Sequence, residues 1–136
     1  MTHTSSSSAR PTTTATPVLR ALQLFAALAV VNVLVQFFTA GQLVSAGGSK
    51  EPHGVGAIVL HVVSGLAALA AVVLWRQGRA GLGLAALGVV VFGCTLVQAA
   101  LGDYASLAVH VPGAMILTAG VVWLLIASLR TGGRRV

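Results

Sequence analysis

The sequence predicts an all-α protein, a membrane-embedded up-down four-helix bundle. Apolar residues make up 57% of the 136 positions and charged residues only 7%, and the mean hydropathy is +0.96. So few charges cannot cover the surface of a water-soluble fold, in which roughly a quarter of the residues are charged, so a cytosolic enzyme is excluded. The net charge of +6 comes from basic residues too scattered to follow a phosphate backbone, so no nucleic acid is expected as a partner.

Four stretches without Asp, Glu, Lys or Arg define the helices, namely residues 21–49, 54–75, 80–102 and 104–129. Each exceeds the ~20 residues that an α-helix needs to cross the ~30 Å apolar layer of a bilayer. Because the backbone finds no water there, such segments are helical. We therefore expect one transmembrane domain, residues 18–130, with helices at about 20–45, 54–75, 80–102 and 104–129.

The connections and tails follow from Gly, Ser, Pro and the charged residues. A Gly/Ser-rich loop runs from the first helix to Pro52, residues 76–79 form the second connection, and a tight turn around Gly102 and Asp103 forms the third. Residues 1–17 are rich in Ser, Thr and Pro, a composition typical of a disordered tail. Residues 131–136 form a short basic tail.

The distribution of basic residues predicts the orientation in the membrane. Seven of the eight fall on one side of an up-down bundle: Arg10, Arg20, Arg76, Arg79, Arg130, Arg134 and Arg135. The other side holds Lys50 and both acidic residues, Glu51 and Asp103. The positive-inside rule then places both termini in the cytoplasm in a multi-pass protein of the cell membrane, with Lys50 on the outer side.

Polar residues inside the predicted helices mark a candidate site, because they are costly in a bilayer and usually face the bundle interior. In the first helix, Asn32, Gln36 and Thr39 are spaced by four and three residues and share one face. The third helix carries Gln98, four residues after Cys94. Nearly all of the strongly polar positions lie in the outer half of the bundle.

Two histidines are expected at equal depth. His61 lies seven residues after Gly54, and His110 lies seven residues after Asp103, so both rings should be roughly 10 Å below the outer boundary. Their helices are diagonal partners, and adjacent axes about 8–10 Å apart give a diagonal gap of about 11–14 Å. Two imidazoles that hold one b-type haem between them suit this gap, and bundle cores are common cofactor sites.

Small and polar residues complete the predicted haem site. Gly65 follows His61 by four residues and Gly113 follows His110 by three, which leaves room for a porphyrin. The predicted cofactor-binding residues are His61, His110, Gly65, Gly113, Gln36 and Gln98, with His61 and His110 as the metal ligands. His53 is expected about 80° round the helix from His61 and ~12 Å higher, which places it outside this site.

A second interpretation makes the histidines structural. A histidine in a membrane can hydrogen-bond a neighbouring helix, with Gln36 or Gln98 as its partner, and small residues are the usual means of close helix packing. The chain would then be a non-catalytic accessory or structural subunit of a membrane assembly.

A short repeat indicates that the bundle is a duplicated helical hairpin. Residues 35–41 at the end of the first helix read VQFFTAG, and residues 97–102 at the end of the third read VQAALG. Each segment is followed by an outer loop and then by a helix that carries a histidine in its outer third.

With this histidine pattern, and with the segment from Gln98 to Gly102 followed by His110, residues 20–130 resemble one four-helix half of haem A synthase. They also resemble small four-helix integral membrane proteins of bacteria that carry a histidine at the start of the second and fourth helices. The resemblance implies that His61 and His110 ligate haem, for electron transfer, haem handling or sensing. The chain departs from the synthase because its first helix has no acidic residue and its outer loops have no cysteine pair.

Other chemistries lack the necessary residues. Both acidic residues lie in the outer loops, so neither a Ser-His-Asp set nor the intramembrane carboxylate of a proton-coupled transporter can form. Motifs for phosphate loops, paired cysteines and zinc proteases are missing, and Cys94 alone forms no internal disulfide. No catalytic residue is predicted, and the composition favours a protein that is not an enzyme. The expected partners are the lipid bilayer and either a membrane redox partner or another copy of the chain.

Overall fold

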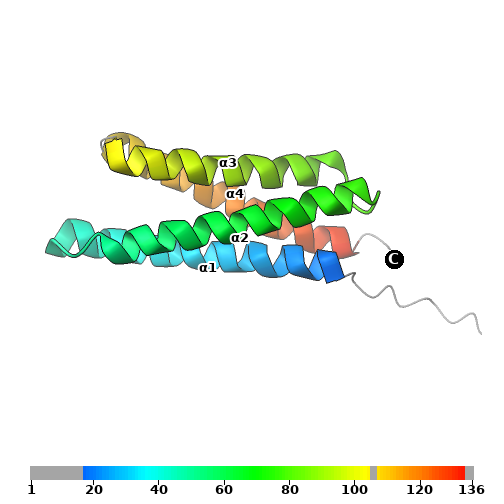
Figure 1. Cartoon of the computed structure of the whole chain (residues 1–136), viewed down its shortest axis with the longest axis horizontal. Helices are drawn as coiled ribbons and strands as arrows, with labels where there is room; N and C mark the ends of the chain where they lie inside the picture. The colour runs from blue at the N-terminus through cyan, green and yellow to red at the C-terminus, as the bar shows by residue number, and fades with distance from the viewer. Residues whose placement is uncertain (1–16, 105–106, 134–136) are drawn as a thin grey trace, which may run out of the picture.

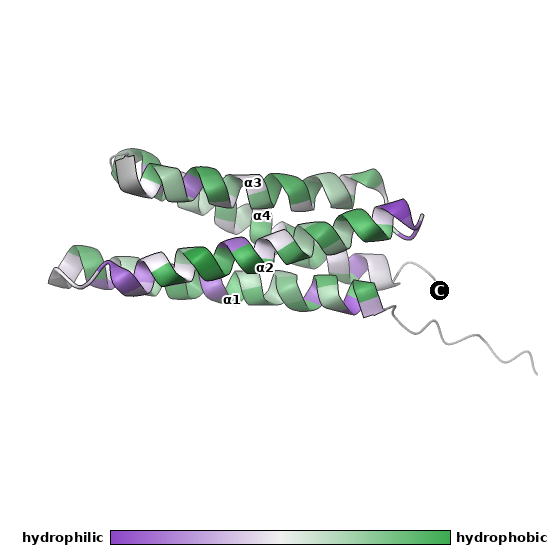
Figure 2. Cartoon of the chain, in the orientation of Figure 1, coloured by the Kyte–Doolittle hydropathy of each residue, from purple (hydrophilic) through white to green (hydrophobic). Residues whose placement is uncertain are grey.

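The computed structural model describes residues 17–104 and 107–133. These residues form four helices, α1 (Pro17–Ala46), α2 (Glu51–Arg76), α3 (Leu82–Tyr104) and α4 (Leu107–Gly133). Each is long and apolar enough to cross a membrane. Figure 2 shows the hydrophobic colour along most of every helix and a strong hydrophilic colour at the two ends of α2. Most of the two predicted tails, residues 1–16 and 134–136, lies outside the described residues.

The helices pack in chain order around a closed ring. α1 packs against α2, α2 against α3, α3 against α4, and α4 returns to α1, while the described residues of the diagonal pairs do not pack together. Figure 1 shows the start of α1, the end of α4 and the α2–α3 turn at one end of the bundle, which we name the terminal end. The opposite end, with residues 47–50, is the loop end. This arrangement confirms the predicted up-down four-helix bundle.

Two helices at the loop end begin at other positions than the sequence predicts. α2 begins at Glu51 rather than at residue 54, because Pro52 fits the first turn of a helix and Glu51 suits its positive end. Gly47 directly follows the last residue of α1 and has φ of +60°, a left-handed conformation that glycine adopts readily. α4 begins at Leu107, three residues later than residue 104.

The predicted turn at Gly102 and Asp103 is wrong, since α3 continues through both residues to Tyr104. Gly102 serves a close contact instead. A Cβ atom at this position would lie 3.1 Å from Cε1 of His110, so the lack of a side chain lets the histidine ring of α4 approach the α3 backbone.

The α2–α3 turn at the terminal end is closed by a glycine. Gly78 has φ of +66°, and its N–H donates to the carbonyl of Trp75 at 2.9 Å. The N–H of Arg79 donates to the carbonyl of Leu74 at 2.9 Å. These bonds satisfy carbonyls at the end of α2 in the manner of a helix C-cap that requires a left-handed residue.

The tightly packed core occupies the terminal end and the middle of the bundle. Its largest fully buried apolar side chains are Leu22, Leu74, Leu124 and Val121. Towards the loop end, the last buried residues of the four helices are Val33 in α1, Gly56 in α2, Thr95 in α3 and Leu117 in α4. The helices therefore hold together mainly through one half of their length and are less closely filled in the other half.

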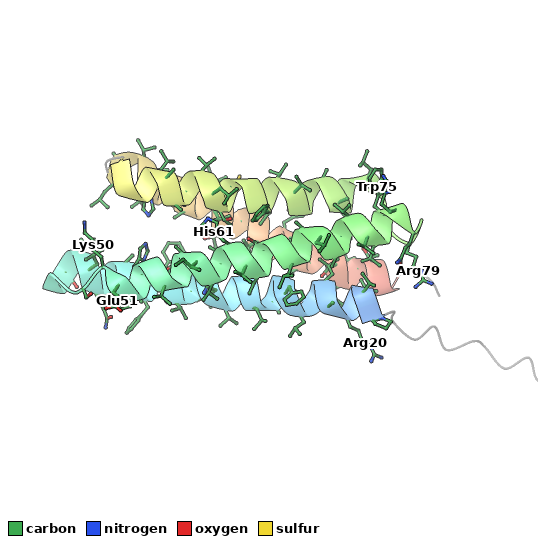
Figure 3. All side chains as sticks on the ribbon, viewed as in Figure 1. Arg20, Lys50, Glu51, His61, Trp75 and Arg79 are labelled. Carbon is green, nitrogen blue, oxygen red and sulfur yellow. The ribbon has the colours of Figure 1, made fainter. Side chains whose placement is uncertain are left out.

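The charged side chains lie at the ends of the bundle. Figure 3 shows Arg20 and Arg79 at the terminal end, and Lys50 and Glu51 at the loop end. Buried hydroxyl groups inside the bundle donate to backbone carbonyls of their own helix. Ser64 is an example, since its Oγ donates to the carbonyl of Leu60 at 2.6 Å.

The Gly88→Leu variant should destabilise the bundle, because α2 and α3 approach closely there. A Cβ atom at Gly88 would lie 3.1 Å from Cα of Ala68 and 3.4 Å from Cβ of Ala71, and neither atom can move aside without moving the helix. Overpacking of this kind costs about 1–3 kcal/mol, so thermal unfolding in detergent should occur at a lower temperature.

Gly93→Leu is the matched control on the same helix, since a Cβ atom at Gly93 would have nothing within 4 Å. It should unfold at nearly the temperature of the unaltered protein. An equal loss in both variants would contradict the close α2–α3 contact.

Candidate functional site

A cavity of about 280 Å³ lies at the loop end, beyond the packed core. All four helices contribute to its lining. Its walls are mostly apolar, and its polar lining residues are Gln36, His53, Gln98 and His110. All four are half-buried. A few convergent polar groups in an apolar cavity are typical of a small-molecule site.

In the first hairpin, α1 and α2 meet through a glutamine that lies on a glycine. A Cβ atom at Gly56 would lie 2.7 Å from Oε1 of Gln36, so the glutamine occupies the space that a side chain would take. One turn further along α1, Oγ1 of Thr39 lies 3.2 Å from Nδ1 of His53. The first turn of α2 is thereby fixed against α1.

The second hairpin repeats this contact between α3 and α4. Oε1 of Gln98 lies against Gly113, so closely that a Cβ atom there would overlap it. The amide nitrogen of Gln98 donates to the carbonyl of His110 at 2.6 Å and lies 3.1 Å from Nδ1 of the same histidine. Gln98 therefore holds both the backbone and the ring of His110.

The two contacts reveal a repeated motif of one glutamine, one histidine and one glycine. Each glycine follows a histidine by three residues, in His53-Gly54-Val55-Gly56 and in His110-Val111-Pro112-Gly113. The glutamine of the preceding helix packs against each glycine. The repeat thus matches His110 with His53, not with His61. The His-x-x-Gly spacing is the sequence signal that identifies His53.

The rings of this pair meet edge to face across the bundle. Their centroids are 6.3 Å apart, and their planes are inclined by 66°. His53 comes from α2 and His110 from α4, so two side chains bridge a pair of helices that do not otherwise pack together. The contact combines the histidine of each hairpin into one site.

The partners of the His110 ring determine where its proton lies. The Gln98 nitrogen lies 2.6 Å from a carbonyl, which can only accept, so this atom is a donor and Nδ1 of His110 accepts its second proton. The neutral His110 ring then carries its own proton on Nε2. The Thr39 hydroxyl oxygen lies 3.1 Å from the carbonyls of Val35 and Gln36 and 3.2 Å from Nδ1 of His53.

His61 lies elsewhere. Its Nδ1 is 2.5 Å from the carbonyl of Ala57 in its own helix, and it is not among the residues that line the cavity. It belongs to the stripe of α2 that faces α3, since Gly65, four residues later, lies against the Phe92 ring. Figure 3 shows His61 part-way along α2, well away from the loop-end residues Lys50 and Glu51.

The predicted site residues are therefore divided between two places. His110, Gln36 and Gln98 line the cavity, and Gly113 lies beneath Gln98. His61 and Gly65 lie at the α2–α3 contact. The space expected beside Gly65 for a porphyrin is filled by the Phe92 ring, and the space beside Gly113 is filled by Gln98.

The helix starts explain the division. The equal depth expected for His61 and His110 is counted from residues 54 and 103, but α2 begins three residues before the first and α4 four residues after the second. His53 is consequently the third residue of α2, and His110 is the fourth residue of α4. At 1.5 Å per residue, these two histidines differ by only one step along their helices.

The three residues of the predicted polar stripe of α1 have different surroundings. Gln36 lines the cavity and Thr39 contacts His53. Asn32, one turn further from the loop end, has a buried Oδ1 with no hydrogen-bond partner among the described residues. An unpaired buried oxygen costs about 1–3 kcal/mol, so Asn32 is a polar position that packing alone does not account for.

The donor set limits what the site can bind. Among residues 17–104 and 107–133, no group of three or more His, Cys, Asp or Glu side chains could hold a metal ion. A bare metal ion in a protein usually has at least three such ligands. Two imidazoles suffice only where the ligand brings further donors of its own, as a porphyrin does.

Comparisons with known proteins give no relative from which a function could be transferred: no family model, no curated protein and no solved structure matches the chain.

Proposed function

We propose that this chain is an integral membrane protein that binds one b-type haem at the loop end of the bundle, for electron transfer, haem handling or sensing. The observation that carries the proposal is the facing pair of His53 and His110. Their ring centroids are 6.3 Å apart, and imidazole is a usual ligand of haem iron.

His110 and His53 would hold the group, and Gln36, Gln98 and the apolar cavity walls would surround it. When bound, haem supplies one-electron redox chemistry whose potential depends on its axial ligands and on the polarity around it. His61, the α2 ligand that the sequence favours, is the alternative partner of His110. The experiment below separates the two.

Thr39 and Gln98 prepare the two rings differently. With Nδ1 of His53 donating to the Thr39 hydroxyl, Nε2 of His53 would carry the lone pair that a metal-ligating histidine requires. Gln98 donates to Nδ1 of His110, so the ring proton must move from Nε2 to Nδ1 before Nε2 can act as a ligand. The Gln98 amide nitrogen must then leave Nδ1, while its bond to the His110 carbonyl can remain.

The second candidate function is a non-catalytic accessory subunit whose histidines only pack and hydrogen-bond. One observation favours it: the Nδ1 atoms of His53, His61 and His110 each have a partner within the chain. The contacts of His53 with Thr39 and of His110 with Gln98 join different helices, and interhelical hydrogen bonds in a bilayer contribute about 0.6–2 kcal/mol each.

The visible spectrum of the detergent-purified protein distinguishes the two candidates. Protein from haem-replete cells should show a Soret band that sharpens on reduction. His53→Ala and His110→Ala should each lose most of the low-spin signal, since one remaining imidazole leaves the iron with an open position. The double variant should be little worse than either single one.

His61→Ala is the matched control and should retain the spectrum. If His61→Ala abolishes the signal and His53→Ala does not, the α2 ligand is His61. Colourless protein would overturn haem binding and leave the accessory function.

We further propose that the terminal end faces the cytoplasm, because the described basic residues of that end are Arg20, Arg76, Arg79 and Arg130, whereas the loop end holds only Lys50 among the described ones. A reporter that is active only in the cytoplasm should work when fused after Val136. Activity of a periplasm-only reporter at the same position would reverse the orientation.

A further inference from the structure

A second cavity lies at the terminal end, far from the histidine pair. It is a cleft of about 430 Å³ between the start of α3 and the end of α4. On the α3 side it is lined by Gly81 and Gly83, where a Cβ atom would have nothing within 4 Å. On the α4 side its lining includes Trp123, Ile126 and Arg130. The lack of side chains at the two glycines keeps the cleft open.

Arg130 is the one charged residue in this lining. The cleft lies at the end of the bundle that also holds Arg20, Arg76 and Arg79, whereas the chain's two acidic side chains belong to residues 51 and 103 at the loop end. Glu51, the acidic residue whose side chain the structure describes, lies at the other end of the bundle, so no described acidic side chain is placed to neutralise Arg130. The cleft has an unmatched positive charge and is suited to an anion.

The rest of the lining indicates what carries that anion. Ile126 and Trp123 lie one and two turns from Arg130 towards the middle of α4 and line the same cleft. Their side chains are 42% and 65% exposed. In a helix that crosses the membrane, these positions lie at the depth of the acyl chains, while Arg130 lies near the boundary. A ligand that satisfies both parts has an anionic head and an apolar body.

We propose that this cleft binds an anionic phospholipid, with its phosphate at Arg130 and its acyl chains along Trp123 and Ile126. A guanidinium group matches the geometry of phosphate oxygens. Basic pockets between membrane helices are a recognised form of headgroup site. The proposal is independent of haem binding, because no residue of the cleft lines the cavity at the loop end.

Native mass spectrometry of the full chain in detergent tests the proposal, with phosphatidylglycerol and phosphatidylcholine as the probes. The unaltered protein should retain phosphatidylglycerol in preference to phosphatidylcholine. Arg130→Ala should weaken phosphatidylglycerol binding roughly fivefold, the size expected of one basic residue at an anionic lipid surface. Gly83→Leu should weaken it as well, because it fills the cleft without changing the charge.

Arg20→Ala is the matched control, since it removes the same charge from the same end of the bundle but outside the cleft. It should bind phosphatidylglycerol as the unaltered protein does. Equal losses in Arg20→Ala and Arg130→Ala would show diffuse attraction to the basic end and overturn the site. Displacement of phosphatidylglycerol by excess inorganic phosphate would overturn the role of the acyl chains and leave a simple anion site.

Discussion

The loop end of this bundle depends on one contact that occurs twice, a glutamine lying on a glycine of the next helix. Gln36 fills the space above Gly56, and Gln98 fills the space above Gly113. Each contact lets a polar side chain occupy the interface where the helices are not held by the buried apolar core. Because each glycine follows a histidine by three residues, the same contact brings His53 and His110 into one site. A side chain at either glycine would displace the glutamine and the adjoining histidine turn.

The two halves of the molecule have different properties for a physical reason. At the terminal end, Leu22, Leu74 and Leu124 are almost wholly buried, and glycine at position 88 lets α2 and α3 approach closely. At the loop end, the helices enclose a cavity of about 280 Å³ in which half-buried glutamine and histidine side chains meet. A well-packed half can support a looser and more polar half, so the small bundle can enclose a cavity without losing its fold.

Much of the fold follows from the sequence, because long charge-free segments leave a backbone in lipid no alternative to the helix. The site follows only in part. Polarity inside the helices predicts Gln36, Gln98 and His110, and these residues line the loop-end cavity. The sequence also predicts His61, which lies outside that cavity, and it places His53 outside the site because it starts α2 at residue 54 and not at Glu51. Pro52 and Glu51 support an earlier start of α2, and Gly102 is a contact with His110 rather than a turn. Helix ends depend on such local effects, and a shift of three residues in each of two helices is enough to change which histidines face each other.

The facing of His53 and His110 is the central structural claim, and an NMR measurement on histidine-labelled protein in detergent tests it most directly. With ring centroids 6.3 Å apart, the two rings should give a nuclear Overhauser cross-peak, assigned by its disappearance in His53→Gln and in His110→Gln. The same sample should show the ring proton of His110 on Nε2, as the Gln98 contact requires. A cross-peak between His61 and His110, with none between His53 and His110, would contradict the proposed site.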